Sequence, residues 1–129
     1  MAHQLTITER PGYLHFRVTG ENNPQTVRAY LAEIHAACIE RGCSAILVEE
    51  DLTGPGLGIL DVFQIVESGG DNARPMLKKI AYVDIRAQAR AGNARFAETV
   101  ALNRGLNLRT FPTAQAAAAW LNGASQPDE

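Results

Sequence analysis

The chain has 129 residues, of which 46% are hydrophobic and 20% are charged, as is typical of one globular domain with its own core. This composition excludes a disordered, collagen-like or coiled-coil chain. The formal net charge of −2 offers no basic field to a phosphate backbone, so it argues against nucleic-acid binding.

The N-terminus lacks the basic segment and apolar run of a secretory signal. The most apolar stretch, 57–66, is far shorter than the roughly 20 residues that cross a bilayer. We therefore expect a cytoplasmic protein without a transmembrane segment. In a reducing compartment the two cysteines, Cys38 and Cys43, are expected to be free thiols. They belong to no Cys/His cluster, so the sequence predicts no structural zinc site.

The first two predicted elements are strands over 4–8 and 13–19, in which apolar and polar residues alternate. The turn residues Pro11 and Gly12 between them predict an antiparallel hairpin. One polar face of the second strand carries Tyr13, His15 and Arg17. Both a polar pocket and an exposed sheet face account for these three side chains.

A helix is predicted next. Asn23 is a good N-cap, Pro24 suits the first helical position, and Gly42 ends the pattern. Apolar residues recur between them at helical spacing, and Cys38 falls on that apolar face.

The continuous apolar run 45–48 predicts a central strand that is covered on both faces. Glu49, Glu50 and Asp51 follow at the strand end, and Asp84 ends a later strand. Carboxylates at one sheet edge can hold Mg²⁺ or accept a phosphoryl group. Solvated charges at strand ends are the commoner explanation.

The remaining predicted elements alternate between helix and strand: a helix over 57–68, a strand over 79–84, a helix over 93–104, a strand over 108–111, and a helix capped by Thr113 that ends at Trp120-Leu121. The order β-β-α-β-α-β-α-β-α predicts a single α/β domain over 1–122. Its mixed sheet has a parallel core and an N-terminal antiparallel hairpin. The polar tail 123–129 is expected to be flexible.

The helix over 57–68 has seven apolar residues among its first ten, more than one sheet face can bury. Leu57, Leu60 and Phe63 are the side chains that we expect to anchor whatever covers this apolar surface. A neighbouring helix, a second subunit, a partner protein or a lipophilic ligand would each cover it.

The loop before this helix lies where open α/β sheets bind ligands. Its glycines, Gly54, Gly56 and Gly58, match neither a dinucleotide fingerprint nor a P-loop. The three histidines do not converge, and a Gly-x-Ser-x-Gly nucleophile elbow is absent from the sequence. The sequence therefore predicts plain turn chemistry, partner or ligand contact, or phosphate binding at this loop, and no enzyme.

Three segments carry a resemblance to a known family. Gly56-Leu57-Gly58-Ile59-Leu60 is similar to the Asp-Ser-Ser-Gly-Leu-Gly-x-Leu signature of the STAS domain superfamily. The strand 78–83 resembles the family's penultimate strand. The C-terminal segment 108–121, with its Phe-x-Thr and Trp-Leu, resembles the SpoIIAA-like branch. The resemblance covers residues 4–122 and implies a single-domain STAS/SpoIIAA-like fold.

The family's anti-sigma-factor antagonists carry a phosphorylated serine just before Gly-Leu-Gly. Pro55 occupies that position here, after Gly54 and Thr53. Proline has no hydroxyl, so the resemblance implies the scaffold without the usual phospho-acceptor.

These observations predict a non-catalytic regulatory protein-interaction module without a cofactor. The expected contact residues are Thr53, Gly54, Gly56, Leu57, Gly58, Leu60 and Phe63. Its partner would be another protein or a second copy in a homodimer formed through the 57–68 helix. One alternative is a SEC14-like carrier of a small lipophilic ligand. A second is a Mg²⁺-dependent phospho-acceptor or small enzyme at Asp51 and Asp84.

Overall fold

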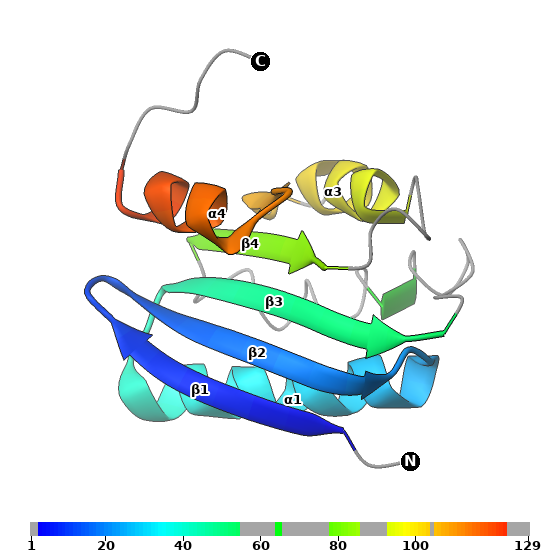
Figure 1. Ribbon diagram of the computed structural model, residues 1–129. Coiled ribbons are helices and arrows are strands. Elements are labelled where there is room, and N and C mark those ends of the chain that lie inside the picture. Colours follow the sequence, from blue (N-terminus) through cyan, green and yellow to red (C-terminus); the bar gives the residue numbers. More distant parts are fainter. Residues whose placement is uncertain (1–2, 55–63, 66–77, 86–92, 104, 124–129) are drawn as a thin grey trace.

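The computed structural model describes residues 3–54, 64–65, 78–85, 93–103 and 105–123. Its strands form one sheet in the order β1-β2-β3-β4-β5, which is also their order in the sequence. Figure 1 shows β1 to β4 side by side in this order. The strands are β1 (Gln4–Arg10), β2 (Tyr13–Glu21), β3 (Ala45–Thr53), β4 (Lys79–Asp84) and β5 (Leu108–Thr110). β1 and β2 pair antiparallel, and every other neighbouring pair is parallel. This confirms the predicted mixed sheet.

The helices that the structure describes in full are α1 (Pro24–Arg41), α3 (Asn93–Asn103) and α4 (Ala114–Leu121). α1 and α3 pack on the same face of the sheet, in one core with Ile46 and Val48 of β3. They share this face because successive right-handed crossovers that advance in one direction place their helices on one side. α4 follows the edge strand and covers Leu47 of β3 and Val83 of β4 on the other face (Figure 1).

Local signals set the helix ends as the sequence predicts. The side chain of Asn23 accepts a hydrogen bond of 2.8 Å from the backbone N–H of Thr26, and Pro24 begins α1. Gly42 ends α1 with φ 65°, a left-handed conformation that glycine adopts without a Cβ clash. The Thr113 hydroxyl caps α4 by accepting from the N–H of Ala116 at 3.1 Å.

The central strand is longer than predicted. The sequence predicts a strand over 45–48, but β3 continues to Thr53. Its side chains keep alternating between the faces, so Glu50 and Leu52 join Val48 on the side of α1. The acidic residues that were expected to terminate the strand are therefore part of it.

The predicted helix over 57–68 lies mostly outside the described residues. Gln64 and Ile65 are described, and both are helical. Gln64 is exposed, and Ile65 is buried in the core shared by α1 and α3. In the described part of the chain, every helix is too short or too polar to span a membrane.

The two cysteines are free thiols in different environments. Cys38 is fully buried, and burial raises the pKa of its thiol to about 11. Cys43 is half-buried, and its Sγ donates to the carbonyl of Ala45 at 2.9 Å.

We expect a thiol reagent to modify Cys43 first and Cys38 only on unfolding, because the accessible thiolate is the reactive species. Mass spectrometry after timed labelling of the wild type and of Cys43→Ser measures both rates. Labelling of Cys38 in native Cys43→Ser, as fast as in the denatured chain, would contradict its burial.

Candidate functional site

The carboxyl ends of the parallel strands β2, β3 and β4 meet at one edge of the sheet. The backbone N–H of Asn22, just after β2, donates to the carbonyl of Thr53 at 2.8 Å. The Thr53 hydroxyl donates to the carbonyl of Gly20 at 3.2 Å. These two hydrogen bonds therefore join the end of β3 to the end of β2 just before the turn at Gly54.

Two of the predicted contact residues lie at this edge. Thr53 is the last residue of β3 and Gly54 follows it, and both are exposed. Gly54 has φ 104°, a conformation that side-chain-bearing residues rarely adopt, so the turn requires glycine. The other predicted contact residues, Gly56, Leu57, Gly58, Leu60 and Phe63, and Pro55 with them, lie outside the described residues.

Beneath this edge lies a buried carboxylate. Glu50 is 4% exposed, on the α1 face of β3. Its two oxygens accept hydrogen bonds from the phenol groups of Tyr30 on α1 and Tyr82 on β4. A buried carboxylate is costly unless donors compensate its lost hydration. Here the two donors come from two other elements, so the group ties α1 and β4 to β3. The expectation of a solvated acidic cluster is wrong for Glu50.

The phenol of Tyr30 titrates abnormally. Burial raises the pKa of Tyr30 well above 10.0, and the negative charge of Glu50 raises it further. Weaker contributions come from Tyr82 and Asp84. Tyr30 therefore remains a hydrogen-bond donor to Glu50 throughout the neutral range.

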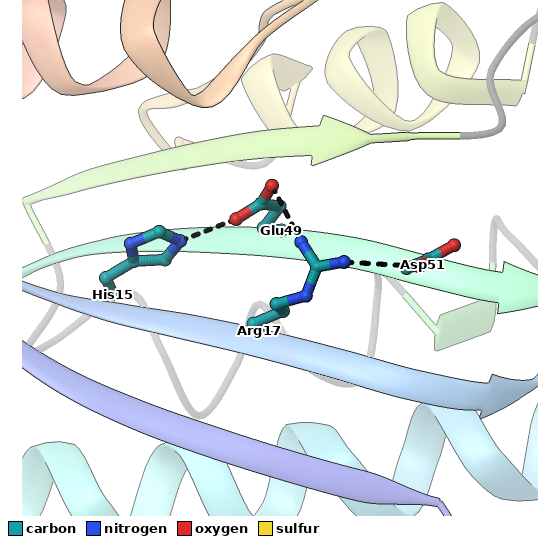
Figure 2. Close-up of polar contacts among 4 residues, drawn as sticks. All are labelled: His15, Arg17, Glu49 and Asp51. Atoms are coloured by element: carbon teal, nitrogen blue, oxygen red, sulfur yellow. Dashed lines mark hydrogen bonds and ion pairs between the residues drawn. The ribbon is translucent and has the colours of Figure 1, made fainter.

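The opposite face of the sheet carries a charged network. Figure 2 shows His15 and Arg17 of β2 pointing toward Glu49 and Asp51 of β3. His15 Nε2 lies 2.8 Å from Glu49 Oε1. Arg17 places Nη1 3.0 Å from Glu49 Oε2 and Nη2 3.3 Å from Asp51 Oδ2. Side chains on the face predicted as polar therefore bind the neighbouring strand, whereas Tyr13, which shares that face, is buried against α4.

The alternative site at Asp51 and Asp84 requires the two carboxylates to meet. Asp84 is the register partner of Glu50 and lies with it on the α1 face. Asp51 follows Glu50 on β3 and points to the other face, where it binds Arg17. The two carboxylates lie on opposite sides of the sheet, so this expectation is wrong. Among the residues that the structure describes, no group of three or more His, Cys, Asp and Glu side chains could hold a metal ion.

A cationic cluster lies at the amino ends of the strands. Lys79, at the start of β4, places Nζ 5.1 Å from the Trp120 ring centroid and donates to the Trp120 carbonyl at 3.2 Å. Arg109 lies 6.0 Å from the same ring centroid, and Phe111 stacks on the ring with a tilt of 40°. These contacts hold the C-terminal end of α4 against the sheet. Lys79 begins β4 and Asp84 ends it, so Lys79 lies far from the acidic edge.

The sequence did not lead us to predict the hydrogen-bonded cluster of Glu50, Tyr30 and Tyr82, here called the Glu50 cluster. The available signal was the alternation of Ile46, Val48, Glu50 and Leu52, which places Glu50 on an otherwise apolar face. Tyr30 on the buried face of α1 and Tyr82 inside a predicted strand were the candidate donors. Treating the three consecutive acidic residues as one solvated cluster hid this pattern.

No protein-family model and no curated protein matches the sequence. Solved structures do match the fold. The crystal structure of an anti-sigma factor antagonist from Mycobacterium paratuberculosis superposes with a TM-score of 0.61 at 14% identity, covering 94% of this chain and 95% of that one. The chain has a SpoIIAA-like fold. An uncharacterized DUF3478-family protein from Shewanella loihica PV-4, described as SpoIIAA-like, gives a TM-score of 0.57 at 16% identity, with 92% of this chain and 93% of that one covered.

The SpoIIAA-like fold agrees with the STAS/SpoIIAA-like resemblance in the sequence. In this fold the described residues place Thr53 and Gly54 at the carboxyl edge of the central strand, above the Glu50 cluster. The charged network of His15, Arg17 and Glu49 occupies the other face of β2 and β3.

Proposed function

We propose that the chain is a regulatory protein-interaction module whose partner binds the carboxyl edge of the sheet. The contact residues are Thr53 and Gly54 together with Gly56, Leu57, Gly58, Leu60 and Phe63. The observation that carries the proposal is the SpoIIAA-like fold over almost the whole chain, with an exposed turn at the end of its central strand. An anti-sigma factor antagonist with this fold is a precedent for binding another protein.

The geometry below the turn supports this role. Glu50, Tyr30 and Tyr82 fix three elements directly beneath the edge, and Asn22 and Thr53 join the ends of β2 and β3. A preorganised surface loses less conformational entropy when a partner binds. Such a surface needs no catalytic group, so the proposed module is non-catalytic.

The proposed module works without the family's phospho-acceptor. Pro55 cannot accept a phosphoryl group, and the nearest hydroxyl, on Thr53, donates to the carbonyl of Gly20. Partner binding would then be controlled by the amount of either protein or by another residue.

A photo-cross-linking amino acid at position 53 tests the surface directly. We expect a side chain at Thr53 to capture a specific protein in the cells that produce this chain. The matched control is position 78, because Lys78 is also exposed but lies at the amino end of β4. With the captured protein purified, Leu60→Asp is expected to weaken binding at least tenfold while the circular dichroism spectrum is unchanged.

Equal capture from positions 53 and 78, or full affinity of a folded Leu60→Asp variant, would contradict the proposed surface. Native mass spectrometry of the purified chain provides a separate check. A mass increment that disappears on denaturation would identify a bound small molecule and favour a carrier instead of a protein-interaction module.

A further inference from the structure

β1 is an edge strand, and within the described residues it borders β2 alone. All seven of its residues pair with β2 in an uninterrupted register, from Gln4 opposite Thr19 to Arg10 opposite Tyr13. Every second backbone N–H and C=O of β1 therefore points away from the sheet. These groups form a seven-residue template on which another strand can pair.

Proteins usually protect such an edge. The common devices are charged side chains, above all lysine, and proline, a bulge or a very short strand. β1 contains neither proline nor lysine, and its uninterrupted register leaves no room for a bulge. Its two charged residues, Glu9 and Arg10, are confined to the C-terminal end, so the strand from Gln4 to Thr8 carries no charge. At the other edge β5 is only three residues long, so that edge is protected by its length. Leu5 and Ile7 of β1 are only half-buried, so they retain apolar surface for a neighbour.

The charges around β1 indicate what that neighbour is. At one end of the strand, His3 Nε2 lies 3.1 Å from Glu33 Oε2 of α1. At the other end, Glu9 Oε2 lies 3.0 Å from Arg41 Nη1 of the same helix. At the first end the strand contributes the basic residue, His3, and the helix the acidic one. At the second end the strand contributes the acidic residue, Glu9, and the helix the basic one. Thr6 lies midway between His3 and Glu9, so a rotation about Thr6 exchanges the imidazole at one end of the strand with the carboxylate at the other.

We propose that two copies of this chain pair through β1, antiparallel, about a two-fold axis at Thr6, so that their sheets join into one. The rotation places His3 opposite the second copy's Glu9. It also places Glu33 at the same level along the joined strands as the second copy's Arg41. An imidazole opposite a carboxylate forms a hydrogen bond, and an ion pair when the imidazole is protonated. The two-fold axis makes this pair occur twice in the dimer.

The remaining pairs across the joint are also compatible. Leu5 meets the second copy's Ile7 on the α1 side, which extends the main apolar core across the joint. Thr6 meets the second copy's Thr6, and Gln4 meets the second copy's Thr8, on the other side. Threonine pairs and aliphatic pairs are favourable across antiparallel strands. This surface differs from the 57–68 helix that the sequence suggested for a homodimer, and it does not depend on the proposed partner site.

A charge introduced at Thr6 tests the proposed register of the β1–β1 pairing. Thr6 and Thr8 are both exposed and lie on the same face of β1. Thr6→Asp puts two carboxylates opposite each other at the two-fold axis, whereas Thr8→Asp faces Gln4. By light scattering after size exclusion, we expect the wild type and Thr8→Asp at twice the mass of one chain, and Thr6→Asp at the mass of one chain. Thr6→Lys alone should also be monomeric, and an equal mixture of Thr6→Asp and Thr6→Lys should recover the dimer.

A monomeric wild type would overturn the proposal, as would a dimeric Thr6→Asp or a mixture that stays monomeric. Oxidation provides a second measurement if the charged variants fail to fold. Thr6→Cys is expected to form a disulfide-linked dimer rapidly, since its two copies meet at the axis. Equal cross-linking of Thr6→Cys and Thr8→Cys would also overturn the proposed register.

Discussion

Glu50→Ala is expected to lower the free energy of unfolding by about 3 kcal/mol. The substitution leaves the phenols of Tyr30 and Tyr82 without their acceptor and opens a cavity where α1, β3 and β4 meet. For a chain of this size the melting temperature should fall by roughly 10 °C. Denaturant titration followed by circular dichroism measures the change.

Glu49→Ala is the matched control, because Glu49 is the neighbouring residue on the opposite face. It loses its contacts with His15 and Arg17, which lie nearer to solvent, and should cost about 1 kcal/mol. Glu50→Gln keeps the shape and one acceptor oxygen, so we expect a loss between those of the two alanine variants. If Glu50→Ala were as stable as Glu49→Ala, the buried carboxylate would not stabilise the fold.

The protein should lose stability steeply in alkali, and Tyr30 should cause much of the loss. Its pKa is raised by burial and by Glu50, from 10.0 in the unfolded chain to well above that value in the folded one. Above pH 10.0 the unfolded chain releases the phenolic proton while the folded chain retains it. The stability from this group is therefore complete below the unfolded pKa and falls as pH rises past it, by about 1.4 kcal/mol per pH unit.

Denaturant titrations at a series of pH values on both sides of 10.0 measure this slope. Tyr30→Phe has no phenol at this position, so its stability is expected to be lower at neutral pH and to fall less steeply in alkali. Phenolate absorbance, followed in parallel, should appear for Tyr30 together with unfolding. Equal alkaline slopes in the wild type and Tyr30→Phe would contradict the assignment.

The sequence predicted most of the fold because its boundaries are marked by local chemistry. Asn23 with Pro24 begins α1, Gly42 ends it, and Thr113 caps α4. Each of these residues acts through its own backbone geometry or through a hydrogen bond to a residue three positions away. Such local interactions can be predicted from neighbouring residues in the sequence. The strand over 79–84 was found with correct ends because its apolar centre is bounded by charged residues.

The candidate site was harder to predict because its contacts join distant elements. Tyr30 and Glu50 are 20 residues apart, and Glu50 and Tyr82 are 32 apart. A carboxylate is assigned to solvent unless its donors are known, and these donors lie on other elements. The error at Asp51 and Asp84 has the same origin, since the pairing register of β3 and β4 decides which faces they occupy.

The strand order has a consequence for how the chain reaches its native state. Each strand pairs with the strand before it in sequence, so the sheet can grow by addition at one edge, beginning with the β1–β2 hairpin. Every loop that closes during growth spans one crossover, and β1 never has to find β5. Closure entropy is therefore distributed over several short steps. A nascent chain could assemble its sheet in synthesis order, with α4 closing the second face last.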